Sequence, residues 1–159
     1  MINYSVQIAK NKDASLDLRR AATVFVQNVV LYHPNIVLNT KGCVNSILNM
    51  IFTLLIEPEE GEGVEVGNDS AFVYAYQTLA EIAMQLPNSV IFNNVMINSI
   101  HMIQSKNFIN RKAAVIAISS ITEGCSNPMK KNMSKIIPAV FKTFNDKNNI
   151  VREAACVAM

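Results

Sequence analysis

The sequence predicts an all-α protein, built as a superhelix of paired helices, from three observations. Apolar residues recur at the i, i+3, i+4, i+7 spacing of helices, and the alternation typical of strands is nearly absent. Glycine and proline number only five each in 159 residues, so few breaks interrupt the helical pattern. A short motif also returns along the chain at a regular interval, which is typical of a solenoid.

Capping residues and prolines delimit the predicted helices. Ser15 can cap a helix that runs to about His33, and Asp69 or Ser70 can cap one that ends near Leu86, with a proline just beyond each. Further helices are expected at roughly residues 42–56, 91–104, 110–123 and 133–144, and the chain ends on a helix that opens near residue 150.

The recurring motif is a basic residue followed two residues later by an Ala-Ala pair, with a short polar residue six positions before it. Arg111 and Arg152 are 41 residues apart, and Arg19 and Arg111 are 92 apart, which leaves room for one degenerate copy between them. That copy has Asp69 in the position of the arginine. Its core stripe is formed by Phe72, Ala75, Tyr76 and Leu79.

Each copy of the motif follows another amphipathic helix, so the unit is two antiparallel helices joined by a turn. One pair cannot bury both apolar faces, and stacking of the pairs gives a right-handed solenoid with a continuous core. About three and a half pairs are expected, in a single array. Their approximate bounds are 1–33, 42–86, 91–124 and 130–159, with the last pair truncated.

The arginine of the motif lies near the start of a helix, where the helix dipole disfavours a cation. The recurrence of the arginine at this position therefore suggests that it pairs with a specific residue. We expect it to bond the turn carboxylate of the adjacent repeat, so that the repeats are joined by a ladder. The ladder residues are Asp13, Arg19, Arg111, Asp146 and Arg152.

Composition argues against several classes of protein. No apolar run reaches the roughly 18–20 residues of a membrane span, and no signal peptide is visible. The spacing of Cys43, Cys125 and Cys156 favours buried thiols over disulfides or a zinc site. His33 and His101 have no carboxylate or cysteine at a useful spacing. We therefore expect no enzyme activity, metal or cofactor.

Two acidic features are candidates for partner binding. Six of the twelve carboxylates fall in one stretch without any Lys or Arg, and this stretch is either a solvated loop or a contact for a basic surface. These residues are Glu57, Glu59, Glu60, Glu62, Glu65 and Asp69. A second set lies off the core stripes at equivalent positions of successive second helices, and it is either a solvated helix surface or a binding face. It consists of Gln77, Glu81, Ser119 and Glu123.

One basic cluster raises the question of nucleic acid. Lys130, Lys131 and Lys135 lie close together, but the cluster is short and has no interleaved aromatic residues. A solubilising turn is the simpler reading, so we expect no nucleic-acid partner.

The Asp-x₅-Arg-x-Ala-Ala pattern on paired helices resembles a HEAT repeat. The stretch "RKAAVIAISSITEGCSNPMKKNMSKIIPAVFKTFNDKNNIVREAACVAM" is similar to receptors of the importin-β (karyopherin-β) superfamily, most of all to the importin-5 (karyopherin β3) branch. The acidic "EPEEGEGVEVGND", followed by "QTLAEIA", resembles an insertion in that branch. The resemblance covers nearly the whole chain.

The resemblance implies a segment of a nuclear import receptor, internal to a longer solenoid that is monomeric and shuttles between cytoplasm and nucleus. Its acidic loops and concave second helices would engage Ran-GTP or basic cargo with a nuclear localisation signal. Phenylalanine-glycine (FG) nucleoporins would bind grooves between first helices, near residues such as Phe92 or Ile97. The alternative is a HEAT-repeat scaffold that holds an enzyme complex such as a phosphatase.

Overall fold

The computed structural model describes residues 1–58 and 70–158, and every regular element within these ranges is an α-helix. The predicted all-α class is therefore confirmed. The helices are α1 (Ile2–Lys10), α2 (Leu16–Tyr32), α3 (Pro34–Asn39), α4 (Cys43–Leu55), α5 (Ala71–Gln85), α6 (Asn88–Ile103), α7 (Phe108–Ser120), α8 (Ser126–Thr143) and α9 (Asn149–Val157).

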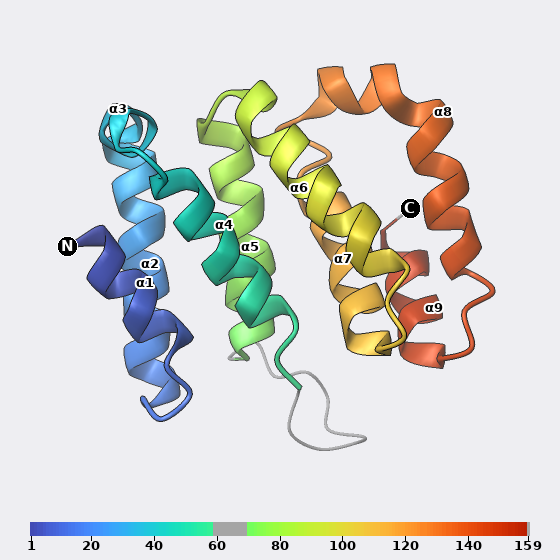
Figure 1. Ribbon diagram of the computed structural model, residues 1–159, viewed down its shortest axis with the longest axis horizontal. Helices are drawn as coiled ribbons and strands as arrows, with labels where there is room; N and C mark the ends of the chain where they lie inside the picture. The colour runs from blue at the N-terminus through green and yellow to red at the C-terminus, as the bar shows by residue number, and fades with distance from the viewer. Residues whose placement is uncertain (59–69, 159) are drawn as a thin grey trace.

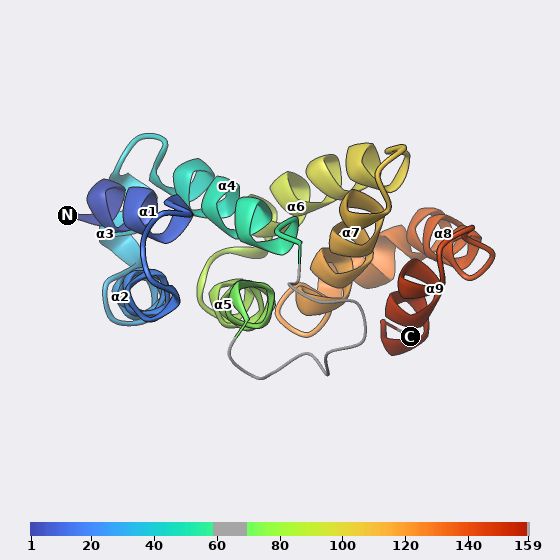
Figure 2. The same ribbon diagram turned by 90° about the horizontal axis from the view of Figure 1, so that it is seen from below.

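The helices form successive pairs that are stacked side by side (Figure 1). Helices α1, α4, α6 and α8 are the first helices of the pairs, and each packs against its own second helix, which is α2, α5, α7 or α9. Each second helix also packs against the next one, so the second helices form a continuous layer. Figure 2 shows α1 and α4 on one side of the array and α2 and α5 on the other. We call these the first-helix layer and the second-helix layer.

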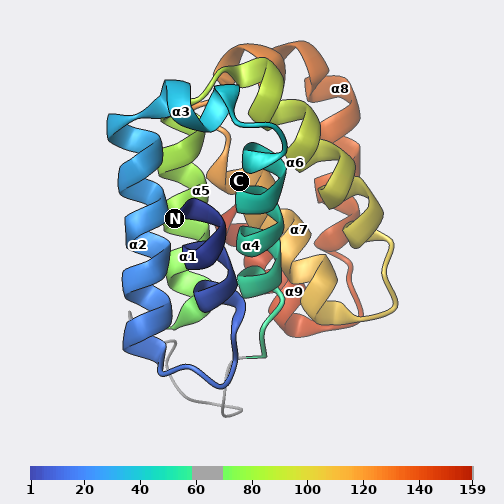
Figure 3. The ribbon, with the colours of Figure 1, turned by 60° about the vertical axis from the view of Figure 1, so that its left-hand side comes forward.

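The connection between the first two pairs contains the short helix α3, whose bounds the sequence did not predict. Pro34 ends α2 as expected, but it also occupies the first position of α3, where its missing N–H costs no hydrogen bond. Gly42 then adopts a positive φ of 75° and forms the N-cap of α4. Figure 3 shows α3 crossing from the end of α2 to the start of α4.

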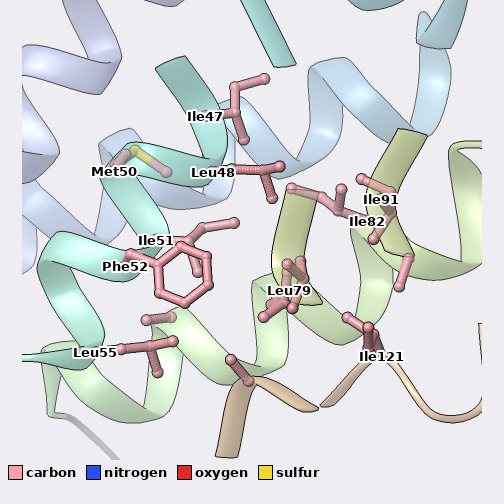
Figure 4. Packing of buried hydrophobic residues seen from close by; sticks show 14 of the residues in the cluster. Ile47, Leu48, Met50, Ile51, Phe52, Leu55, Leu79, Ile82, Ile91 and Ile121 are labelled. Carbon is pink, nitrogen blue, oxygen red and sulfur yellow. The ribbon is translucent and has the colours of Figure 1, made fainter. Parts of the chain in front are cut away.

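The main core lies between the first and second helices of each pair and continues into the next pair. Ile47 and Ile51 of α4 are 1% and 0% exposed, and Leu79 and Ile82 of α5 are 0% and 1% exposed. Figure 4 shows these side chains pointing toward one another, with Ile91 and Ile121 beside them. Burying a large aliphatic side chain contributes about 1.5–3 kcal/mol, so this shared cluster ties the pairs together.

Several helix boundaries differ from the predicted ones; α6, for example, begins at Asn88, three residues before the predicted start. Helix α8 begins at Ser126 and not near Met133, because Pro128 falls in its first turn, where a proline is tolerated. Helix α7 begins at Phe108, two residues before the predicted start. It ends at Ser120, so the turn that follows contains Glu123, which was expected on the helix.

Candidate functional site

The best-defined polar contact joins the third and fourth helix pairs. The Arg111 guanidinium donates two hydrogen bonds to the Asp146 carboxylate, with N–O distances of 2.6 and 2.7 Å. Its third nitrogen donates to the backbone carbonyls of Ser105 and Lys106. The Arg111 hydrogen bonds hold the pKa of Asp146 below its ordinary value, and the Asp146 carboxylate raises the pKa of Arg111. A bidentate pair of this kind fixes both distance and orientation.

A second contact of the same kind joins the first and second pairs, with a different acid. Arg19 is buried at 8% exposure and donates through Nε to the Ala9 carbonyl at 2.9 Å. Its Nη2 forms an ion pair with Glu57, in the turn after α4. The sequence placed Glu57 in an acidic binding loop, whereas its half-buried carboxylate faces Arg19. The separation along the chain, 38 residues, is close to the 35 between Arg111 and Asp146, and this spacing was a signal that could have identified the pair.

The other ladder positions are occupied differently. Ser105 stands where Asp146 stands in the next pair, and its hydroxyl accepts hydrogen bonds from Asn107 N and Asn110 Nδ2. Arg152 donates to the carbonyls of Asp146 and Lys147, as Arg111 does one repeat earlier. The predicted ladder residue Asp13 lies exposed in the turn before α2, where its backbone N–H donates to Asn11.

The rest of the predicted acidic stretch lies outside the described residues. Those positions are Glu59, Glu60, Glu62, Glu65 and Asp69. The partner-binding role assigned to them therefore stays a prediction.

The second-helix candidates lie where the second layer meets solvent, with one change. Gln77 and Glu81 are exposed on α5, and Ser119 is half-buried near the end of α7. Glu123 is exposed but sits in the turn beyond α7, so it is not the helical equivalent of Glu81. The neighbouring Gly124 packs directly against the α5 backbone, so the turn that holds Glu123 lies against the helix that holds Glu81.

The close approach at Gly124 has a steric cause. A Cβ atom at Gly124 would lie 2.4 Å from the carbonyl carbon and oxygen of Ala83, well inside van der Waals contact. Only glycine lets this turn lie against α5 at such a distance. Gly124 therefore has a packing role between neighbouring repeats.

The first-helix layer contains an apolar groove of about 480 Å³ between α6 and α8. One wall is α6, the other is α8, and Ile118 of α7 contributes from below. We call it the α6–α8 groove. Of the two nucleoporin-contact residues suggested from sequence, Phe92 is 8% exposed and lines this groove, and Ile97 is 70% exposed but is not part of its lining. Its lining residues are Phe92, Met96, Ile100, Ile103, Gln104, Ile118, Asn132, Lys135, Ile136, Ala139, Lys142, Thr143 and Asp146.

In the ranges 1–58 and 70–158 the thiols and the other side chains that could bind a metal are not clustered. Cys43 and Cys125 are buried, which raises the pKa of each thiol, but Cys156 is exposed, so the expectation that it is buried is wrong. In the same ranges no group of three or more His, Cys, Asp or Glu could hold a metal ion, and no helix is both long and apolar enough to cross a membrane.

The fold and these contacts define a HEAT-repeat solenoid, a class of protein in which stacked helix pairs present extended surfaces. The HEAT-like repeat family model matches residues 109–159, which contain the Arg111–Asp146 pair. Over 170 aligned residues the chain is 22% identical to importin subunit beta-3 of Saccharomyces cerevisiae, covering 98% of this chain and 15% of that protein.

Solved structures show the same fold. The structure of Kap121p bound to Nup53p matches with a TM-score of 0.89 and 20% identity, over 99% of this chain and 16% of that one. Kap121p bound to RanGTP matches with a TM-score of 0.87 at the same identity and coverage. Together these structures show that the chain has the fold of a HEAT-repeat solenoid. The chain spans about 15% of the length of the curated relative that it matches.

Proposed function

We propose that this chain is a segment of a nuclear transport receptor, and that it acts by binding without catalysis. The observation that carries the proposal is the match of the whole described array to Kap121p, with TM-scores of 0.87 to 0.89 over 99% of the chain. Solved structures of that protein hold RanGTP in one case and the SUMO protease Ulp1p in another. Ran-GTP and cargo proteins are accordingly the proposed partners, and FG nucleoporins complete the set.

We place the Ran-GTP or cargo contact on the second-helix layer. Glu81 and Glu123 are both exposed there, and the packing of Gly124 on Ala83 brings their segments together. Exposed carboxylates attract Lys or Arg side chains of a basic partner, mainly by raising the rate and specificity of association. Because the contact is exposed, its strength falls as salt increases. Shuttling between cytoplasm and nucleus follows from this proposal.

The test measures binding of Ran, loaded with a non-hydrolysable GTP analogue or with GDP, to the 159-residue chain at low and at physiological salt. The wild type is compared with a Glu81→Gln, Glu123→Gln variant. A matched control, Asn45→Lys with Asn93→Lys, adds the same net charge at exposed positions of the first-helix layer. Exposed pairs contribute roughly 0.2–1 kcal/mol each, so the loss of two pairs is expected to weaken binding of the Gln variant about two- to thirtyfold at low salt, and the control should bind within about twofold of the wild type.

Two outcomes of this binding test would count against parts of the proposal. If the chain shows no preference for the GTP-loaded form, and a basic localisation-signal peptide also fails to bind, the transport proposal is wrong for this segment. A scaffold that holds an enzyme complex then becomes the better reading, because such a protein has no dependence on Ran. If binding occurs but both variants lose it equally, the second-helix location is wrong and the receptor assignment stands.

A further inference from the structure

The α6–α8 groove is an elongated apolar channel whose walls are regular helix faces. On α6 the lining residues Phe92, Met96, Ile100 and Ile103 follow one another at spacings of four, four and three residues, so they form one continuous stripe. The facing stripe on α8 runs from Asn132 to Thr143. Each stripe spans eleven residues, or about 16 Å at the helical rise of 1.5 Å. The groove can therefore hold a short peptide segment lying along its length.

The floor and the rim of the groove differ in exposure. Phe92 and Met96 are 8% and 9% exposed, and Ile118 is 4% exposed, so the floor is set by packing within the array. Ile100, in contrast, is 48% exposed on the rim, where it can be covered by an incoming side chain. Apolar surface of this kind contributes binding free energy when a partner removes it from water.

The rim carries positive charge and no free carboxylate. Neither α6 nor α8 contains an Asp or Glu, whereas α8 places the exposed Lys135 and Lys142 along the edge of the groove. Within the described ranges no ion pair joins either lysine to a carboxylate. Asp146 lines one end, but its carboxylate is held by Arg111 through two hydrogen bonds. The groove therefore offers a cationic edge to whatever lies in it.

We propose that the α6–α8 groove docks a short amphipathic, acidic segment of a partner protein. Its apolar side chains would lie on Phe92, Met96 and Ile136, and two carboxylates would pair with Lys135 and Lys142. These lysines are seven residues apart on one helix, so their backbone positions are about 10 Å apart. A helical segment with two Glu at i and i+7 reproduces that spacing, in the helix-in-groove mode of recognition.

The low exposure of the groove's aromatic lining favours a peptide over a nucleic acid. A single strand also brings negative charge, but it needs exposed aromatic faces on which bases stack. The aromatic lining residue of the groove is Phe92, which is only 8% exposed. An uncharged apolar peptide would use the floor but would leave both lysines without partners. An acidic amphipathic segment would place apolar side chains on the floor and carboxylates beside both lysines of the rim.

The test uses a fluorescein-labelled, twelve-residue amphipathic peptide with two Glu seven residues apart, and fluorescence anisotropy against the 159-residue chain at low salt. Two companion peptides carry Gln at both positions or consist of uncharged FG pairs. The Lys135→Glu, Lys142→Glu variant is compared with Lys41→Glu, Lys130→Glu, which makes the same charge change at exposed positions outside the groove. A third variant, Ile100→Ser, trims the apolar rim without touching the buried core.

We expect the Glu peptide to bind at least about tenfold more tightly than the Gln peptide, since two charge-assisted contacts are at stake. The groove variant should lose about tenfold or more, Ile100→Ser should lose a few-fold, and the control variant should stay within about twofold. Equal binding of the Glu, Gln and FG peptides would overturn the charge selectivity. Equal losses in the groove variant and the control, or the absence of saturable binding, would overturn the site.

Competition separates the remaining class of ligand. A short single-stranded oligonucleotide should not displace the Glu peptide, and displacement at similar concentration would overturn the choice of a peptide partner. This proposal does not rest on the transport function, because the Ran-GTP test addresses the opposite, second-helix layer. Either proposal can therefore fail without the other.

Discussion

Replacement of Asp146 by Asn tests whether the ladder contact stabilises the stacking of repeats. In the native protein Asp146 Oδ2 accepts from Arg111 Nε, and Oδ1 accepts from Arg111 Nη2 and from the backbone N–H of Asn148. Asn has almost the same shape and keeps one carbonyl oxygen. It removes the charge and places an NH₂ group against the Nε–H donor of Arg111, so that one charge-assisted bond is lost.

The magnitude follows from the burial of the pair. The side chains of Arg111 and Asp146 are 15% and 10% exposed, so solvent screens the contact only in part. A hydrogen bond to a charged group contributes about 1.5–3 kcal/mol, and one such bond is lost here. We expect Asp146→Asn to lower the free energy of unfolding by about 2 kcal/mol. For a chain of this size that corresponds to a drop in Tm of about 4–8 °C.

Urea unfolding and thermal melts, both followed by far-ultraviolet circular dichroism, measure the change in stability. A double-mutant cycle with Arg111→Gln isolates the pairwise term from the bonds that Arg111 makes to backbone carbonyls. The dependence on pH is a second readout. Because the fold lowers the pKa of Asp146, its contribution is fully present above the unfolded pKa, near 3.8. It is lost as the pH falls through the lower, folded value.

A matched control is Glu153→Gln, which removes an exposed carboxylate from α9 and should change the free energy of unfolding by less than about 0.5 kcal/mol. The reasoning is refuted if Asp146→Asn lies within that same range of the wild type and the cycle shows no coupling with Arg111. It is also refuted if the difference between wild type and variant persists undiminished as the pH is lowered below the unfolded pKa of Asp146, because the contribution must fall there.

Three further predictions follow from single side chains. Gly124→Ala should destabilise the fold by about 1–3 kcal/mol, measured by urea unfolding, because the new Cβ meets the Ala83 backbone at 2.4 Å; unchanged stability would mean that the turn moves freely. Ser99→Ala should raise Tm, because the fully buried Ser99 hydroxyl has no hydrogen-bond partner among the residues that the structure describes, and its removal saves about 1–3 kcal/mol of desolvation; a lower Tm would reveal a partner. In the folded protein one thiol, that of Cys156, should react quickly with a maleimide, and the two buried thiols should react only on unfolding; mass spectrometry of the labelled chain tests this, and rapid double labelling would contradict the buried assignments.

Local signals in the sequence predicted several elements well. Ser15 and Ser70 were expected to cap helices, and each side chain accepts a hydrogen bond from the backbone N–H three residues later. The stripe that begins at Phe72 is buried or half-buried along its length. These features depend on residues within one or two turns of each other, which is why they can be read without knowledge of the fold.

Other features depend on contacts between repeats, which neighbouring residues in the sequence do not reveal. Glu57 follows an apolar helix and precedes more acids, so its neighbours suggested a solvated or partner-binding loop, although the side chain pairs with Arg19 from the previous repeat. Glu123 appeared to be in helical register with Glu81, but α7 ends at Ser120. Composition does not show where a helix ends or which residues the following turn contacts.

The sequence by itself determined the helical class, the period near forty residues and the arginine of each ladder contact, because these features follow from the spacing of residues along one chain. Only the tertiary structure decided which acid meets which arginine, why Gly124 must lack a side chain, and where α6 and α8 leave a groove. The physical reason is that helix periodicity is set by the local backbone, whereas ion pairs and grooves are set by the distance and angle between packed helices. Those distances come from the summed packing of the whole array.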